Sequence, residues 1–259
     1  MADRWRSALI TGASSGIGRA LALELARGGT RRLVLVARRA EELARVAAEV
    51  SELGGEAAVE VLDVADADRC AARMRELDDA MGGLDLVVAN AGQGAPSGAN
   101  PLAWETLRGP LHVNFCGAAA TLTGALPAMI ARGRGHLVGI GSLASYGPLP
   151  EAAAYCSPKA GLSMLLACLA MDLEDKGVAV TDVRLGFVKT AMVARATHPM
   201  PQLAEPEDVA RHVVHRLLEK PRQVVYPRAL GAATRVFALA PEAVRRRVLG
   251  RASPGRSGS

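Results

Sequence analysis

Tyr155 and Lys159 are the residues of this sequence whose types and spacing best suit acid–base chemistry. They stand four positions apart, so on a helix both side chains lie on one face. A free tyrosine has a pKa of about 10 and transfers protons poorly near neutral pH, but a fixed ammonium nearby favours the phenolate. By itself such a pair more often marks a surface or packing tyrosine. Its interpretation depends on the elements that position it.

A glycine-rich turn near the N-terminus predicts a phosphate-binding site. An apolar strand runs into residues 11–18, and a helical pattern with Leu21 and Leu25 follows. Glycines permit the tight turn, and free N–H groups at the helix start attract an anion. The spacing is Gly-x-x-x-Gly-x-Gly, not the commoner Gly-x-Gly-x-x-Gly. The turn residues expected to bind a dinucleotide are Gly12, Ser14, Ser15, Gly16, Ile17 and Gly18.

The end of the second apolar strand bears on the choice of cofactor. This strand ends at Arg38 and Arg39, and the nearest carboxylates, Glu41 and Glu42, belong to the next helix. In dinucleotide-binding folds an acidic residue at this position binds the ribose 2′-hydroxyl, whereas arginine accommodates a 2′-phosphate. Arg38 therefore favours NADP(H) over NAD(H). The alternative is that both arginines merely open a solvated helix.

Strands and helices alternate along the chain at the spacing of βαβ units. Strands are predicted at residues 7–10, 33–37, 57–62, 84–89, 135–142, 178–185 and 223–226, with a long helix over 111–130. Another helix should begin around Tyr155, because Pro158 is tolerable only in a first turn. The expected fold is α/β, a single Rossmann-type doubly wound domain over residues 1–252. Residues 187–205 are expected to form a substrate lid and residues 253–259 a disordered tail.

Five signals stand in one order: the turn ending at Gly18, then Asp63, Asn90-Ala-Gly92, Ser142 with Tyr155-x-x-x-Lys159, and residues 186–190. By these five signals and their order, the sequence resembles the short-chain dehydrogenase/reductase family, and the resemblance covers residues 5–230. The resemblance implies an oxidoreductase that moves hydride between a nicotinamide and a carbonyl or alcohol. Because of this resemblance, we interpret Tyr155 as a catalytic residue.

The resemblance implies a role for each residue of the catalytic group. Tyr155 would be the general acid in reduction and the base in oxidation. Ser142 would hydrogen-bond the substrate carbonyl and stabilise developing oxyanion character. Lys159 would bind the nicotinamide ribose and lower the pKa of Tyr155. Asn114 would hold a water that continues the proton path.

The resemblance also assigns residues to the cofactor and to assembly. Besides the turn, Arg38, Tyr155 and Lys159, the cofactor residues are Asp63 and Val64 beside the adenine, Asn90, Ala91 and Gly92 along the adenosine, and Val188 and Thr190 near the carboxamide or a phosphate. Members of the family often form homodimers or homotetramers through two long helices, here residues 111–130 and 155–176. The sequence departs from the family pattern at Leu185, usually proline, and at Gly141, often a second serine.

The amino-acid composition limits the class of protein to which this chain can belong. Half the residues are hydrophobic and 22% are charged, as in soluble globular proteins. No apolar run reaches the roughly 18 residues of a membrane span, and the first strand begins too early for a signal peptide. A cytoplasmic protein is therefore expected. The four cysteines and five histidines show no metal-binding spacing, so no metal is expected.

The positive charge is concentrated near the C-terminus. The net charge is +5, and from Thr181 onward there are 14 lysines and arginines against 6 aspartates and glutamates. Arg245, Arg246 and Arg247 contribute part of the excess. A solvated basic tail is the favoured interpretation, and peripheral contact with anionic lipid or an acidic partner is the alternative. No aromatic residues interleave with this charge, so nucleic acid is not an expected partner.

The sequence thus predicts an NADPH-preferring oxidoreductase acting on a small carbonyl or alcohol. Leu143, Tyr146, Leu149, Met192 and Met200 near the expected pocket indicate an apolar or lipid-like substrate. One alternative is a non-catalytic NADP(H)-binding sensor or interaction protein, which would typically lack a member of the catalytic group. Another is a sugar-nucleotide epimerase or dehydratase, which favours a different turn and a larger C-terminal domain.

Overall fold

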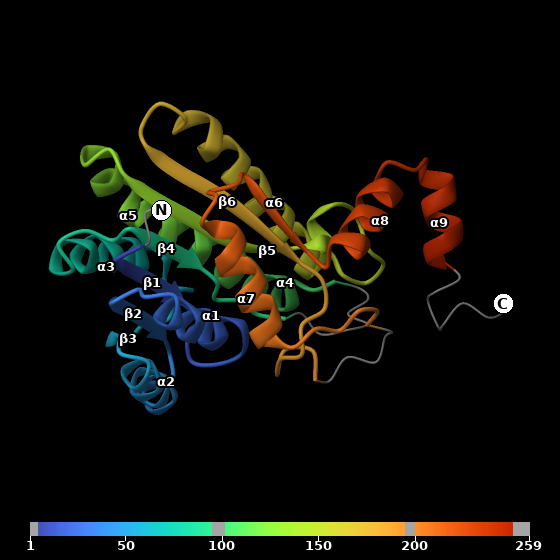
Figure 1. Cartoon of the computed structure of the whole chain (residues 1–259). Helices are drawn as coiled ribbons and strands as arrows, with labels where there is room; N and C mark the ends of the chain where they lie inside the picture. Colours follow the sequence, from blue (N-terminus) through green and yellow to red (C-terminus); the bar gives the residue numbers. More distant parts are fainter. Residues whose placement is uncertain (1–4, 95–101, 195–199, 251–259) are drawn as a thin grey trace.

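The computed structural model describes residues 5–94, 102–194 and 200–250 of the chain. Within them, seven strands form one parallel sheet in the order β3-β2-β1-β4-β5-β6-β7 (Figure 1). The strands are β1 (Ser7–Thr11), β2 (Arg32–Ala37), β3 (Glu56–Val61), β4 (Leu86–Ala89), β5 (Gly135–Ser142), β6 (Val178–Leu185) and β7 (Gln223–Tyr226). All seven lie within two residues of their predicted bounds.

Helices connect the strands and continue beyond the last one. They are α1 (Gly16–Arg27), α2 (Ala40–Glu52), α3 (Ala67–Ala80), α4 (Trp104–Leu111), α5 (Ala118–Ala131), α6 (Ala153–Asp172), α7 (Pro206–Leu217), α8 (Arg228–Ala238) and α9 (Glu242–Gly250), with a π-helical segment η1 (His112–Gly117) and a 3₁₀ turn η2 (Leu143–Ser145).

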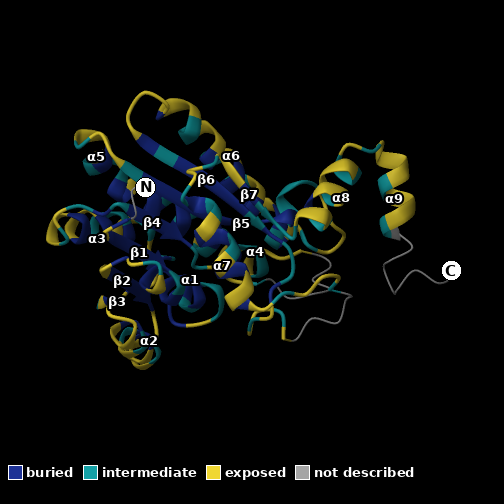
Figure 2. Ribbon diagram, viewed as in Figure 1, coloured by how far each residue is buried: buried dark blue, intermediate teal, exposed yellow. Residues whose placement is uncertain are grey.

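Both faces of the sheet are covered because its strands alternate their side chains between two apolar cores. Ala8 and Ile10 of β1 pack with α1, α2 and α7, whereas Leu9 between them packs with α3, α5 and α6. Figure 2 shows the central strands as buried and the outer helix faces as exposed. Burial on both sides requires the continuous apolar runs seen in the sequence. The predicted doubly wound α/β fold is confirmed.

The strand order changes direction between β1 and β4, because β2 and β3 lie on one side of β1 and the later strands on the other. All neighbouring strands are parallel. Their carboxyl ends, at Thr11, Ala89, Ser142 and Leu185, therefore share one edge of the sheet. Ligands of doubly wound folds bind outside this edge at the change of direction.

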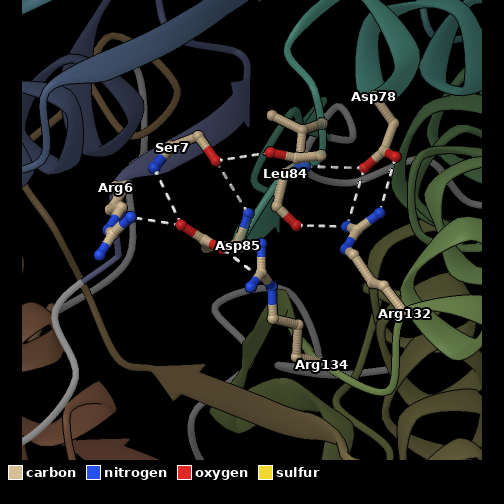
Figure 3. Close-up of polar contacts among 8 residues, drawn as sticks. Arg6, Ser7, Asp78, Leu84, Asp85, Arg132 and Arg134 are labelled. Carbon is tan, nitrogen blue, oxygen red and sulfur yellow. Dashed lines mark hydrogen bonds and ion pairs between the residues drawn. The ribbon is translucent and has the colours of Figure 1, made fainter.

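The opposite edge of the sheet is fixed by buried polar contacts (Figure 3). Asp78 on α3 accepts hydrogen bonds from the Arg132 guanidinium at 2.8 and 2.9 Å and from the Leu84 backbone N–H at 2.8 Å. The Ser7 hydroxyl accepts from the Asp85 N–H at 3.0 Å. Bidentate charge-assisted pairs of this kind are strong. They hold β1, β4 and α3 together at the end remote from the ligand edge.

The helix before β5 is longer than predicted. It runs continuously from Trp104 to Ala131, with the π-helical segment η1 in its middle. A Cβ at Gly117 would lie 2.5 Å from the Val64 carbonyl oxygen, so the glycine permits this helix to approach the chain after β3. Single π-helical turns of this kind often occur at functional sites.

The prediction for Pro158 is wrong. Helix α6 begins at Ala153, so Pro158 lies inside the helix and not in its first turn. The helix therefore lacks the hydrogen bond that residue 158 would donate to the Ala154 carbonyl. The Ser157 hydroxyl donates to the neighbouring Ala153 carbonyl at 2.8 Å.

Two helices are long and apolar enough to cross a membrane by length and hydropathy alone, whereas the sequence predicts no such stretch. They are Trp104–Ala131 and Ala153–Asp172, and 50% and 39% of their most apolar windows are buried within the structure. Core helices pass the same test. Leu122, Met129, Leu162 and Leu166 of these helices fill the core on one face of the sheet.

Two predicted segments fall partly or wholly outside the described residues. The predicted tail, residues 253–259, lies outside them, as do residues 195–199 of the predicted lid. The two ends of that lid segment lie side by side, because Val188 forms a β-bridge with Ala204. The Lys189 N–H donates to the Ala204 carbonyl at 2.9 Å.

Candidate active site

The glycine-rich turn between β1 and α1 is held against the end of β4. The Thr11 hydroxyl accepts hydrogen bonds from the N–H groups of Asn90 and Ala91, both at 3.1 Å, and the Asn90 amide donates to the Thr11 carbonyl at 2.9 Å. Gly12 has φ +68°, and a Cβ there would lie 2.8 Å from the Ala91 Cα. A Cβ at Gly18 would lie 2.2 Å from the Gly12 carbonyl oxygen. No larger residue fits at either glycine.

The start of α1 is open toward a cavity. Gly16 has φ +54°, and a Cβ there would lie 3.0 Å from the Thr190 Cγ2, so the chain after β6 approaches the turn. Ser15 makes no side-chain cap at the helix start. A cavity of about 550 Å³ lies here, lined by Gly16, Thr190 and the following residues. An uncapped helix start beside a glycine cradle suits a pyrophosphate.

The two arginines after β2 point to different partners. Arg39 donates from Nη2 to the Ser14 hydroxyl at 3.0 Å and to the Ser15 hydroxyl at 2.8 Å. Arg38 lies 3.6 Å from the Asp63 carboxylate, and its side chain is 74% exposed. The arginine that joins the turn is therefore Arg39 and not Arg38, which the sequence predicted.

The remaining residues predicted at the adenosine side are also brought to this edge. Asp63 follows β3, and its carboxylate accepts from the Ala65 N–H at 3.0 Å. Val64 is buried and packs against Gly117. Ile17 packs on the apolar core beneath the turn. The turn and residues 63–64 thus border the same strand ends.

The predicted catalytic residues Ser142, Tyr155 and Lys159 come together where β5 ends and α6 begins. The hydroxyls of Ser142 and Tyr155 are hydrogen-bonded to each other. Ser142 also accepts from the Ala144 N–H at 3.2 Å, which fixes its side chain at the start of η2. Lys159 is only 5% exposed and donates to the Ile140 carbonyl at 2.8 Å. The structure thus places an acid, a hydrogen-bond donor and an ammonium at one strand end.

The electrostatics of Tyr155 differ from the prediction. Burial raises the pKa of its hydroxyl, and the hydrogen bond with Ser142 opposes this rise. The predicted lowering by Lys159 does not appear, because desolvation dominates and the ammonium donates to Ile140. Burial likewise lowers the pKa of Lys159 to about 8, and the negative charge of Asp182 opposes that shift.

Asn114 lies in η1, and its side chain is hydrogen-bonded to the backbone that follows β4. Its Oδ1 accepts from the Gln93 N–H at 2.7 Å, and its Nδ2 donates to the Gln93 carbonyl at 2.8 Å. A Cβ at Gly92 would lie 3.4 Å from the Asn114 Oδ1. Asn114 therefore positions residues 90–93, and no sequence signal identified Gln93 as its partner.

The chain after β6 covers the same strand ends. Val188 is buried at the base of this segment. The Met192 Cε would lie 3.5 Å from a Cβ at Gly92, so this methionine packs over the end of β4. Leu143 is buried and Leu149 is exposed. Among residues 5–94, 102–194 and 200–250, no group of three His, Cys, Asp or Glu side chains forms a metal site. The fold and these residues define a dinucleotide-dependent oxidoreductase.

Comparisons with known proteins agree. The chain matches the short chain dehydrogenase family over residues 6–201. It is 44% identical over 237 residues to an uncharacterised oxidoreductase of Myxococcus xanthus, covering 92% of this chain and 93% of that protein. It is 31% identical over 218 residues to a cyclohexanol dehydrogenase of an Acinetobacter species, covering 81% and 86%.

Solved structures extend the similarity to the whole fold. A short-chain dehydrogenase from Sphingobium yanoikuyae in complex with NADPH gives a TM-score of 0.79 at 25% identity, covering 98% of both chains. Other similar structures hold NADP or NAD. The chain belongs to the short-chain dehydrogenase/reductase family and is an NAD(P)-dependent oxidoreductase. The sensor and epimerase alternatives are thereby set aside.

Proposed function

We propose that the protein interconverts an apolar ketone or aldehyde with its alcohol and prefers NADPH to NADH. The observation that carries the proposal is the hydrogen-bonded pair of Ser142 and Tyr155 hydroxyls beside the Lys159 ammonium at the ligand edge of the sheet. Two hydroxyls that converge on one carbonyl oxygen can both stabilise and protonate it.

Ser142, Tyr155 and Lys159 each have a separate role in the reduction of the carbonyl. When bound at this edge of the sheet, the nicotinamide cofactor would supply the hydride for the carbonyl carbon. Ser142 donates a hydrogen bond to the carbonyl oxygen, and Tyr155 gives its proton to that oxygen as negative charge develops. Because burial raises the Tyr155 pKa, its hydroxyl is protonated near neutral pH and suits the reductive direction. Lys159 binds the nicotinamide ribose.

The proton path is completed by Asn114 through its backbone. The side-chain amide of Asn114 is already hydrogen-bonded to the backbone of Gln93. A water beside Asn114 would therefore hydrogen-bond to the Asn114 backbone carbonyl in η1. The π-helical segment supports this role because it displaces carbonyls from the regular helical pattern.

The preference for NADPH rests on Arg39 together with the turn serines. A 2′-phosphate carries nearly two negative charges and is matched by a guanidinium and by hydroxyl donors. Arg39, Ser14 and Ser15 already lie within hydrogen-bond distance of one another. Arg38 is a weaker candidate, because it pairs with Asp63 in solvent.

Two apolar side chains near the strand ends and one relative support an apolar substrate. Met192 packs over the end of β4, and Leu143 follows Ser142 directly. A relative at 31% identity is a cyclohexanol dehydrogenase.

A cytoplasmic location is part of the same proposal, because the four cysteines are free thiols and a reducing compartment keeps them so.

NADPH oxidation against a panel of cyclic ketones, straight-chain aldehydes and polar hydroxyketones tests the proposal. We expect turnover of apolar members, lowered by about two to four orders of magnitude in Tyr155→Phe. Tight NADPH binding with no turnover of any carbonyl, or of any alcohol with NADP⁺, would contradict the proposed reaction. Turnover of polar members alone would contradict only the substrate class.

A further inference from the structure

The two C-terminal helices expose apolar side chains. Helices α8 and α9 extend beyond the sheet after β7 and are largely exposed (Figures 1 and 2). Val236 and Leu239 at the end of α8 are 70% and 83% exposed, and Val244 and Val248 on α9 are 48% and 52% exposed. Exposed side chains of this size, gathered on neighbouring helices, typically mark an interaction surface.

The same helices carry an excess of positive charge. Arg228 and Arg235 lie on α8, and Arg246 and Arg247 lie exposed on α9. Arg245 is different, because its Nη1 turns toward Gly147 and the residue is half-buried. The acidic residue of these helices is Glu242, which pairs with Arg246 at 3.5 Å. The exposed charge of α8 and α9 is therefore strongly positive.

A basic cleft adjoins α8. It has a volume of about 370 Å³ and is lined by Arg216, Arg228, Arg235, His212 and Tyr146 among others. Within the described part of the chain, Arg228 and Arg235 have no carboxylate partner. The pKa of His212 is lowered by burial and then by Arg216, Arg228 and His215, which shows the positive field around it. Such a cleft suits a phosphate group.

We propose that α8 and α9 form a docking surface for an anionic lipid bilayer. Val236, Leu239, Val244 and Val248 would enter the headgroup–acyl boundary, while the arginines and the basic cleft meet lipid phosphates. Apolar residues flanked by arginine on amphipathic helices are the pattern of interfacial binding. Charge complementarity favours this occupant over a second copy docked symmetrically, because α8 and α9 of that copy would present the same positive charge.

Flotation with vesicles of phosphatidylcholine, with and without phosphatidylglycerol, tests the proposal. We expect binding only to the anionic vesicles, weakening as salt is raised. Arg228→Glu/Arg235→Glu should reduce binding at least about tenfold, since each basic residue near the surface contributes severalfold. The matched control, Arg31→Glu/Arg75→Glu, changes the net charge equally at exposed positions outside α8 and α9 and should retain binding.

A second variant separates lipid from self-association. Leu239→Ser/Val248→Ser should weaken vesicle binding and leave the protein's solution mass unchanged. No binding at low salt, or equal loss in the Arg31/Arg75 control, would overturn the proposal. Vesicle binding that survives both the Arg→Glu and the Ser variants would also overturn the proposal. A lower solution mass of the Ser variant without loss of vesicle binding would overturn it too, because a second copy would then cover the surface. NADPH affinity reports that each variant is folded.

An independent feature lies beneath the catalytic lysine. Asp182 on β6 is 5% exposed, and its Oδ2 accepts from the Arg184 Nε at 2.6 Å. Its Oδ1 has no hydrogen-bond partner among the described residues. That oxygen lies 2.8 Å from where a Cβ at Gly141 would stand, next to Ile140, whose carbonyl accepts from Lys159. The unpaired carboxylate oxygen and the ammonium thus meet the same stretch of β5.

We propose that Asp182 is a positioning residue whose negative charge keeps Lys159 in its ammonium form during catalysis. Burial of the lysine lowers its pKa to about 8, and the Asp182 charge acts in the opposite direction. Other titratable groups on α6 and on the elements packed against it are Glu105, Arg108, His112, Cys116, His136, Tyr146, Tyr155, Cys156, Cys168, Asp172 and Arg184. Of all these groups, the Asp182 carboxylate is the one whose charge shifts the pKa of Lys159.

The chain has four lysines, so ¹⁵N-lysine NMR can follow the Lys159 amine directly against pH. Asp182→Asn should lower its titration midpoint by about one unit or more. Arg184→Met breaks the same ion pair but keeps the carboxylate, so it should not lower the midpoint, and Asp182→Glu should preserve it. Equal lowering in the Asn and Met variants, or an unchanged midpoint in Asp182→Asn, would overturn the proposal. If Asp182→Asn does not fold, a lowered midpoint in Asp182→Glu would overturn it.

Discussion

The assignment of the 2′-phosphate site to Arg39 leads to a sharp prediction. Arg39→Gln removes the guanidinium that joins Ser14 and Ser15, whereas Arg38→Gln removes one that pairs with Asp63 in solvent. The two variants change neighbouring residues by the same chemistry. Any difference between them therefore reports which arginine reaches the cofactor.

The expected magnitudes follow from the two environments. A charge-assisted hydrogen bond to a phosphate contributes about 1.5–3 kcal/mol, which corresponds to roughly a ten- to hundredfold change in affinity. An exposed ion pair such as Arg38–Asp63 contributes about 0–1 kcal/mol. Arg39→Gln should thus weaken NADPH binding by roughly ten- to a hundredfold and leave NADH binding nearly unchanged. Arg38→Gln should weaken NADPH binding less than about fivefold.

Fluorescence titration with NADPH and NADH measures these dissociation constants without knowledge of the substrate. Equal affinities of the wild-type protein for the two cofactors would refute the preference itself. An Arg38→Gln loss that equals or exceeds the Arg39→Gln loss would refute the assignment. A thermal melt of each variant shows whether a loss of binding reflects a loss of fold.

Three further outcomes are expected. Gly12→Ala should abolish cofactor binding, because its Cβ would lie 2.8 Å from Ala91, and cofactor titration beside a thermal melt checks this. The folded-state pKa of His136, lowered by burial to about 3, lies below its unfolded value, so stability present above pH 6.5 should fall as the pH drops, by roughly 2 kcal/mol at about pH 5. His136→Gln should flatten that part of the dependence in urea denaturation, and an unchanged slope would contradict it. Met164→Arg, on the exposed face of α6, should reduce the mass of the expected dimer or tetramer in light scattering, and a monomeric wild type would refute that assembly.

The parts that the sequence predicted best are those in which one local rule is decisive. Continuous apolar runs predicted central strands such as β2 and β4, because strands of a parallel sheet that are buried on both faces require apolar residues throughout. The helical spacing of Tyr155 and Lys159 predicted that both side chains lie on one face of a helix, and in the structure both side chains contact residues at the end of β5. The glycines of the turn could be identified because backbone contacts there exclude any side chain.

The parts that the sequence could not predict depend on contacts between distant residues. Arg38 and Arg39 are chemically alike, and only the folded chain shows that Arg39 reaches the turn. The tyrosine pKa was expected to fall through its lysine, but the depth of burial reverses the direction. Gln93 is identified as the partner of Asn114 only once η1 and the end of β4 are seen together.

Gly141 shows how a departure from the family pattern can have a structural cause. From the sequence, a glycine in place of a serine before Ser142 suggests only a change in local loop geometry. In the structure, any Cβ at this position would lie 2.8 Å from the Asp182 Oδ1 and 3.6 Å from the Ser163 hydroxyl. The absence of a side chain at residue 141 therefore makes room for a buried carboxylate. Because that carboxylate opposes the loss of the Lys159 charge, the glycine at residue 141 leaves the space in which the Asp182 carboxylate can act.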